Sequence, residues 1–162
     1  MGESTRDLAV RAELRTRPGG GLFPARAVRV RQTVAQSLTN ATWTQIAMTT
    51  EDEDAGSEWA SSQYTCQRGG VYLVTGVVAF AANVTNSRWV RLENNAVPID
   101  GCAKNSPPLA GGNLTSLDFS WSVRLAANDA LRVMGFQDSG GLLDTFAGAP
   151  YMSSLQIVLV AT

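Results

Sequence analysis

The densest group of reactive side chains in the sequence is an acidic run, Glu51-Asp52-Glu53-Asp54. Paired carboxylates can hydrolyse glycosides, and carboxylate oxygens can bind calcium. Neighbouring side chains of an extended segment point in opposite directions, however, so these carboxylates do not converge on one substrate. Their spacing also differs from that of an EF-hand loop. We therefore interpret residues 51–57 as a solvated loop, with calcium binding as the alternative.

The sequence contains no histidine. Histidine is the usual general base of enzymes and a common ligand of catalytic metals, and Ser-His-Asp or Cys-His arrangements need it. The run Gly19-Gly20-Gly21 follows no expected strand and precedes no expected helix, so we interpret it as a hinge and not as a phosphate-binding loop. These features predict that the chain is not an enzyme and needs no cofactor or metal.

Two cysteines, Cys66 and Cys102, permit at most one internal disulfide. Their spacing matches no zinc-binding motif. The interpretation we favour is that both are buried free thiols, which pack as small apolar side chains. A disulfide between them is the alternative.

Charge is divided unevenly along the chain. Residues 1–31 carry seven arginines against three acidic residues, a net charge of +4, whereas the remaining 131 residues carry six basic and eleven acidic side chains, a net charge of −5. A basic segment joined to an acidic body favours docking on an acidic protein surface. Nucleic acid is the weaker alternative, because apolar and acidic residues interrupt the arginines, and we predict no nucleic-acid partner.

The first 24 residues are predicted to form an extended N-terminal arm that docks the protein on a larger structure. Residues 4–16 fit two patterns, since Ser4 could cap a helix while apolar and polar residues alternate as in a strand. Arg17-Pro18 and the glycines that follow break any regular element. The arm residues expected to make the docking contacts are Leu8, Val10, Arg11, Leu14, Arg15 and Phe23.

From residue 25 to residue 162 short apolar segments alternate with turn residues, and no helical period is evident. Strands are expected near residues 28–32, 43–46, 71–80, 88–93, 114–125, 131–135 and 155–160, and a loop at 105–112. Turns every roughly 8–12 residues are typical of a β-sandwich or barrel. The strand that ends the chain is expected to be central in its sheet, which favours a jelly roll. We predict an all-β jelly-roll β-sandwich.

Segments of this body resemble the tumour necrosis factor and complement globular-head superfamily, in the form found in phage and bacterial proteins. They are residues 40–44 leading into 50–54, the Gly-x-Tyr strand within 66–73, residues 88–95, and residues 125–133 with the closing strand. The resemblance spans about residues 26–162 and implies a TNF-like fold that assembles as a homotrimer. The body departs from the animal proteins in its aromatic positions and has no collagen repeat, so their receptor contacts are not carried over.

The strand at residues 71–80 is apolar on both sides, so both of its faces need cover. One side carries Tyr72, Val74, Val78 and Phe80, which we take as the candidate trimer or core residues. The other side carries Val71, Leu73, Val77 and Ala79. One side can fill the core of the sandwich while the other meets neighbouring subunits; cover by the same chain is the alternative.

The resemblance and the basic arm favour a bacteriophage virion structural protein. The preferred role is a decoration protein that stabilises the head, with the arm bound to the major capsid protein. Because no heptad or collagen repeat would project the body, a tail or receptor-binding protein that binds a host glycan or protein is the first alternative. A free bacterial lectin-like module is the second. The expected location is the particle surface, after synthesis in the host cytoplasm without a signal peptide or membrane insertion.

Overall fold

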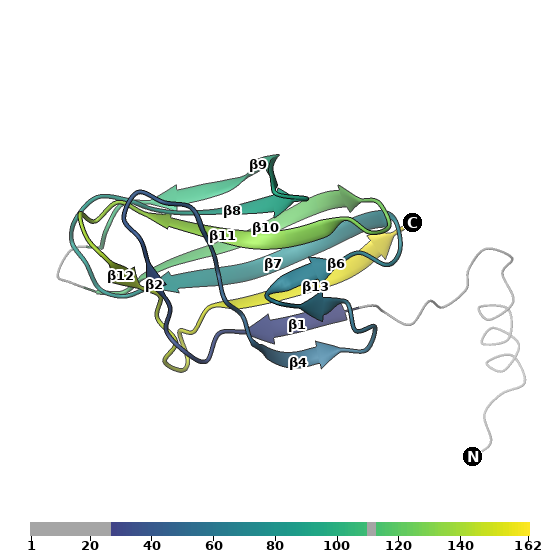
Figure 1. Ribbon diagram of the computed structural model, residues 1–162, viewed down its shortest axis with the longest axis horizontal. Helices are drawn as coiled ribbons and strands as arrows, with labels where there is room; N and C mark the ends of the chain where they lie inside the picture. Colours follow the sequence, from purple (N-terminus) through teal and green to yellow (C-terminus); the bar gives the residue numbers. More distant parts are fainter. Residues whose placement is uncertain (1–26, 110–112) are drawn as a thin grey trace, which may run out of the picture.

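The computed structural model describes residues 27–109 and 113–162. Within these ranges all the regular secondary structure is β-strand. Two antiparallel sheets pack face to face as a β-sandwich (Figure 1). The all-β fold predicted from the alternating pattern is therefore confirmed. In the described part of the chain no helix is long and apolar enough to cross a membrane.

The first sheet has five strands, and the last strand of the chain lies in its middle. Across the sheet the order is β10 (Thr115–Leu125), β7 (Gly70–Phe80), β13 (Ser154–Ala161), β1 (Ala27–Arg31) and β4 (Thr50–Asp54). The C-terminal strand β13 pairs with β7 on one side and with β1 on the other, as the sequence predicted for it.

The second sheet has six strands and covers the other side of the core. Its order is β5 (Trp59–Ala60), β6 (Gln63–Thr65), β11 (Ala130–Gln137), β8 (Arg88–Asn94) and β9 (Val97–Ser106), with β3 (Thr44–Gln45) paired to β11 as well. A separate two-stranded ribbon joins β2 (Ser37–Leu38) to β12 (Leu143–Asp144). This ribbon lies at the end of the sandwich opposite the end of β13 (Figure 1).

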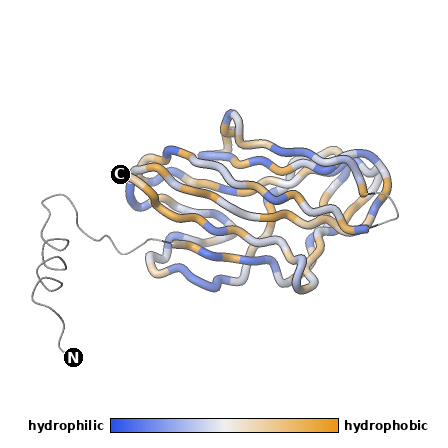
Figure 2. The backbone as a smooth tube through the Cα atoms, turned by 180° about the vertical axis from the view of Figure 1, so that it is seen from behind, coloured by the Kyte–Doolittle hydropathy of each residue, from blue (hydrophilic) through white to orange (hydrophobic). Residues whose placement is uncertain are grey.

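The core is formed by the inward faces of both sheets, because apolar and polar residues alternate along the long strands (Figure 2). Along β10, for example, Leu117, Phe119 and Val123 are buried while the serines between them are exposed. Gly76 of β7 lets the Phe119 ring lie against the sheet, since a Cβ there would come within 2.7 Å of Phe119 Cζ. Each fully buried Leu, Ile, Val or Phe contributes about 1.5–3 kcal/mol through the hydrophobic effect.

The prediction that the acidic run is a loop is wrong. Residues 50–54 form the edge strand β4, which pairs with β1. An edge strand with charged side chains resists pairing with other chains, and β4 is hydrophilic along the lower edge of Figure 2. Arg31 of β1 donates to the Asp52 carboxylate at 2.8 Å. Asp54 accepts hydrogen bonds from the backbone N–H groups of Glu58 and Trp59, both at 2.9 Å, which fixes the following turn.

The loop expected at residues 105–112 begins later than predicted. Asn105 and Ser106 belong to β9, where they pair with Trp89 and Arg88 of β8. Pairing with a neighbouring strand extends the ladder into residues whose types favour turns, because the backbone hydrogen bonds do not depend on the side chain.

Both cysteines are free and buried, as the favoured interpretation held. Cys66 follows β6 and its thiol donates to Arg68 O at 3.1 Å, whereas Cys102 lies on β9. Burial raises the pKa of the Cys102 thiol, so this side chain stays protonated and packs as an apolar group.

The turn between β10 and β11 is held by the Asp129 carboxylate. It accepts hydrogen bonds from the Ala126 backbone N–H at 2.8 Å and from the amides of Asn94 and Asn95 at 2.9 and 2.8 Å. The Ala126 hydrogen bond, followed by those of the two amides, holds the pKa of Asp129 below its ordinary value of 3.8. Asn128 precedes it with φ of 72°, a left-handed conformation that asparagine tolerates.

We expect Asp129→Asn to lower the melting temperature by a few degrees at pH 7. A carboxyl group with a depressed pKa stabilises the fold above its unfolded pKa, and that stability is lost as the pH falls through the folded pKa. The difference between the two proteins should therefore shrink below pH 3.8. Thermal melts followed by circular dichroism at several pH values measure this, and a gap that stays constant into acid would contradict the role given to the carboxylate.

Candidate functional site

The outer face of the five-stranded sheet carries apolar side chains that the described residues leave partly uncovered. Leu73 of β7 is 36% exposed, and its direct partner across the ladder is Val158 of β13. Val71 and Val77 of β7 are half-buried on the same face. Val160, beside the irregular end of β13, is 54% exposed. We call Val71, Leu73, Val77 and Val158 the outer apolar face.

The strand residues singled out from the sequence lie on the opposite side of β7. Tyr72, Val74, Val78 and Phe80 are all 0% exposed and belong to the core of the sandwich. Burial, its largest cause, raises the pKa of Tyr72 to about 12. The structure thus assigns the core role to these four residues, and the outer apolar face is the side of β7 that remains available to a neighbour.

Charged and polar groups flank the outer apolar face on both sides. Next to β7, the outward residues of β10 are serines, Asp118 and Arg124. Beyond β13, a pocket of about 520 Å³ is lined by Arg29, Arg31, Asp52, Val77, Pro150, Met152 and Ser154. The outward pair Thr75–Gln156 lies between Leu73–Val158 and Val77, so this face mixes apolar and polar side chains, as protein–protein interfaces commonly do.

A second partly covered apolar region lies between the edge strands β9 and β10, where the two sheets meet. Trp121 of β10 is half-buried and stacks on Phe119, with ring centroids 4.6 Å apart and planes 16° apart. Ile99 of β9 is likewise partly buried against the core. Lys104 of β9 reaches across to Asp118 of β10, with Nζ 3.3 Å from Oδ1 and 2.8 Å from the backbone oxygen.

The outward side of the six-stranded sheet carries aromatic residues that the sequence interpretation did not single out. Trp89 of β8 pairs across the ladder with Phe136 of β11, and the Phe136 ring lies 5.3 Å from that of Trp43. The alternation of Trp89 with buried Arg88 and Val90 was the available signal.

Residues predicted for chemistry are otherwise accounted for by the fold. The Asp52 carboxylate accepts a hydrogen bond from Arg31, and the Asp54 carboxylate holds the turn after β4. The described residues contain no group of three side chains that could hold a metal ion. The docking residues of the arm, Leu8, Val10, Arg11, Leu14, Arg15 and Phe23, lie outside the described ranges.

Solved structures of three proteins share this arrangement of sheets. Eiger TNF from S. frugiperda superimposes with a TM-score of 0.63 at 14% sequence identity, covering 86% of this chain and 94% of that chain. The globular domain of zebrafish complement 1qA gives 0.63 at 13% identity, covering 83% and 97%. Murine APRIL gives 0.62 at 13% identity, covering 84% and 99%. No family model and no curated protein sequence matches the chain. The fold is a TNF-like jelly roll.

Proposed function

We propose that this chain is a non-enzymatic surface module that works as a homotrimer, in which the outer apolar face is covered by neighbouring copies. The observation that carries the proposal is the pairing of Leu73 with Val158 at the centre of a sheet, on the side away from the core. Apolar residues gathered there gain about 25 cal/mol per Å² when a partner removes them from water.

A threefold assembly requires two different surfaces on each copy, since a ring forms by head-to-tail contacts. The outer apolar face supplies one surface. The region between β9 and β10, with Trp121 and Ile99, supplies a second apolar surface on the same molecule. Repeating this contact around an axis covers both surfaces in all three copies.

We place this trimer on a bacteriophage particle, as a decoration protein of the head. Support comes from the division of charge, because residues 1–31 carry +4 and the rest of the chain −5. A basic segment of this kind can bind an acidic shell while the acidic body projects from it. A threefold module also matches threefold positions of a capsid surface. A tail protein that binds the host surface is the second candidate, favoured by the outward aromatic residues of the six-stranded sheet.

Electron cryo-microscopy of particles that carry the protein tests this placement. We expect trimer-shaped density at threefold positions of the head, and loss of that density when residues 1–24 are deleted. Density at the tail tip would transfer the proposal to host attachment. If the protein copurifies with no particle, the virion role is refuted. The trimer is tested separately, by measuring the mass of the protein in solution.

A further inference from the structure

Three aromatic side chains and one carboxylate line a pocket of about 430 Å³ on the outward side of the six-stranded sheet. The lining residues are Trp43, Trp89, Phe136 and Asp138. Trp89 is 37% exposed, and Trp43 and Phe136 are half-buried, so ring surface is open to solvent. The volume lies within the range of about 300–1,000 Å³ that is typical of small-molecule sites.

The polar side of the pocket is held in place by its own hydrogen bonds. Asp138 Oδ1 accepts from the backbone N–H of Ser87 at 2.7 Å, and the Asp138 carbonyl accepts from the Asn86 amide at 2.8 Å. Beneath them, the fully buried Arg88 donates to the carbonyls of Thr85 and Ser87 at 2.9 and 3.1 Å. The hydrogen bonds of Ser87 and Asn86 to Asp138 thus tie the loop before β8 to the end of β11. Burial lowers the pKa of Arg88, and the nearby Asp138 opposes this.

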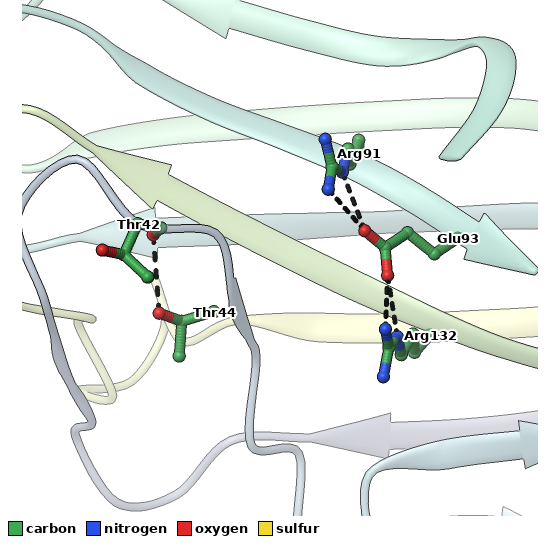
Figure 3. A network of polar contacts seen from close by, with 5 residues as sticks. All are labelled: Thr42, Thr44, Arg91, Glu93 and Arg132. Atoms are coloured by element: carbon green, nitrogen blue, oxygen red, sulfur yellow. Dashed lines mark hydrogen bonds and ion pairs between the residues drawn. The ribbon is translucent and has the colours of Figure 1, made fainter. Parts of the chain in front are cut away.

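The aromatic side is fixed by a chain of charges on the same face. Arg91 Cζ lies 4.0 Å from the centre of the Trp43 ring. Glu93 is 2% exposed and lies between Arg91 and Arg132 (Figure 3). Arg91 Nε donates to one carboxylate oxygen of Glu93 at 3.0 Å, and Arg132 Nε donates to the other at 2.9 Å. Because Glu93 holds Arg91 in place over the Trp43 ring, the ring is oriented before any ligand arrives.

The charges decide which kind of ligand fits. Among the residues that line the pocket, Asp138 carries the charge, and Arg91 lies over the Trp43 ring while it shares the Glu93 carboxylate with Arg132. The Trp43 ring already has a guanidinium on it. A quaternary ammonium ligand, which aromatic cages otherwise bind, would therefore meet like charge. A ligand with an apolar face and hydroxyl groups at its rim fits better. Its apolar face can stack on the exposed rings, and its hydroxyl groups can form hydrogen bonds with the planar charged groups of Asp138 and Arg91.

We propose that this pocket binds a pyranose sugar of a surface glycan. The C–H face of the sugar ring stacks on Trp89, and its hydroxyl groups donate to Asp138 and accept from Arg91. This goes beyond the proposed trimeric module, since the pocket is complete within one copy and lies on the sheet opposite the outer apolar face.

Saturation-transfer NMR and tryptophan fluorescence on the full-length protein test the site, with glucose, galactose, rhamnose and N-acetylglucosamine as probes. We expect at least one sugar to bind, with the strongest transfer to the C–H protons of one ring face. Trp89→Ala should weaken binding about tenfold, through lost stacking and burial. Asp138→Asn, which keeps an acceptor for Ser87, should weaken it as well. Tyr151→Ala removes an aromatic ring that is 59% exposed elsewhere and should bind as the unmodified protein does.

Three results would overturn the proposal. The first is no transfer to any of the four sugars. The second is binding that Trp89→Ala leaves unchanged. The third is binding of tetramethylammonium in place of sugars, which would make the pocket a cation cage. A fall in the mass of the assembly on Trp89→Ala would instead assign the rings to a contact between copies, so the mass of each variant is measured beside its binding.

Discussion

Replacing Leu73 by aspartate should convert a trimer of about 52 kDa, three copies of a 17.2 kDa chain, into monomers. Leu73 is 36% exposed in the single copy and points away from the core, so the fold of the monomer should survive the change. In the proposed trimer the same position is covered, and each copy would bury a carboxylate without a partner. Leaving a buried charge unpaired costs about 3–5 kcal/mol, or at least a hundredfold in each contact.

Light scattering coupled to size exclusion measures the mass of both proteins. Leu142→Asp serves as the matched control, because Leu142 is 72% exposed near the start of β12 and lies outside both proposed surfaces. We expect this control to keep the mass of the unmodified chain. A 17.2 kDa mass for the unmodified protein, or an intact trimer with Asp at position 73, would remove the assembly model.

Glu93→Ala should destabilise the fold by about 3 kcal/mol, with a drop in melting temperature of roughly 10 °C. Glu93 is buried between Arg91 and Arg132, whose side chains are 22% and 26% exposed. Removal of the carboxylate leaves two guanidinium groups facing each other on one side of the sheet. Their partial exposure lets water reach them, which keeps the loss at the lower end of the range of about 3–5 kcal/mol for broken buried ion pairs.

Urea unfolding followed by tryptophan fluorescence gives the free energy of unfolding for each variant. Glu51→Ala on the edge strand β4 is the control, since its side chain is exposed and a surface change of this kind costs about 0.5 kcal/mol or less. Glu93→Gln keeps a hydrogen-bond acceptor and should fall between the two. If the free energy of unfolding of Glu93→Ala equalled that of the Glu51→Ala control, the ion pairs of Glu93 would contribute nothing measurable to stability.

The sandwich could be predicted because the long strands alternate cleanly between apolar and polar residues. The central place of β13 followed from a separate argument, that a terminal strand at the edge of a sheet would fray. The edge strand β4 could not be predicted, because four consecutive acidic residues are typical of a solvated loop. What makes them a strand is a partner distant in sequence, β1, whose Arg29 lies opposite Glu53 and whose Arg31 pairs with Asp52.

For the candidate surfaces, the pattern along β7 showed that two faces were apolar but not which one the second sheet covers. That choice depends on which face of the five-stranded sheet the second sheet packs against, and it covers the face of Tyr72 and leaves Leu73 outside. For the aromatic pocket, alternation along β8 marks Trp89 as an outward residue but does not show which other rings lie beside it. Trp43, Trp89 and Phe136 come from three strands or their ends, and only the register of β11 with β3 and β8 brings them together.

The position of β13 also sets the order of events during synthesis. The antiparallel pairs β7–β10 and β1–β4 lie on opposite sides of β13, so the two pairs join into one five-stranded sheet only when β13 inserts between them. Val158, half of the central contact of the outer apolar face, arrives with that strand. A nascent or truncated chain that lacks residues 154–161 therefore has neither a closed sheet nor a complete assembly surface. In the proposed trimer, a copy whose synthesis has not passed β13 would lack part of the contact surface, so we expect unfinished chains not to assemble.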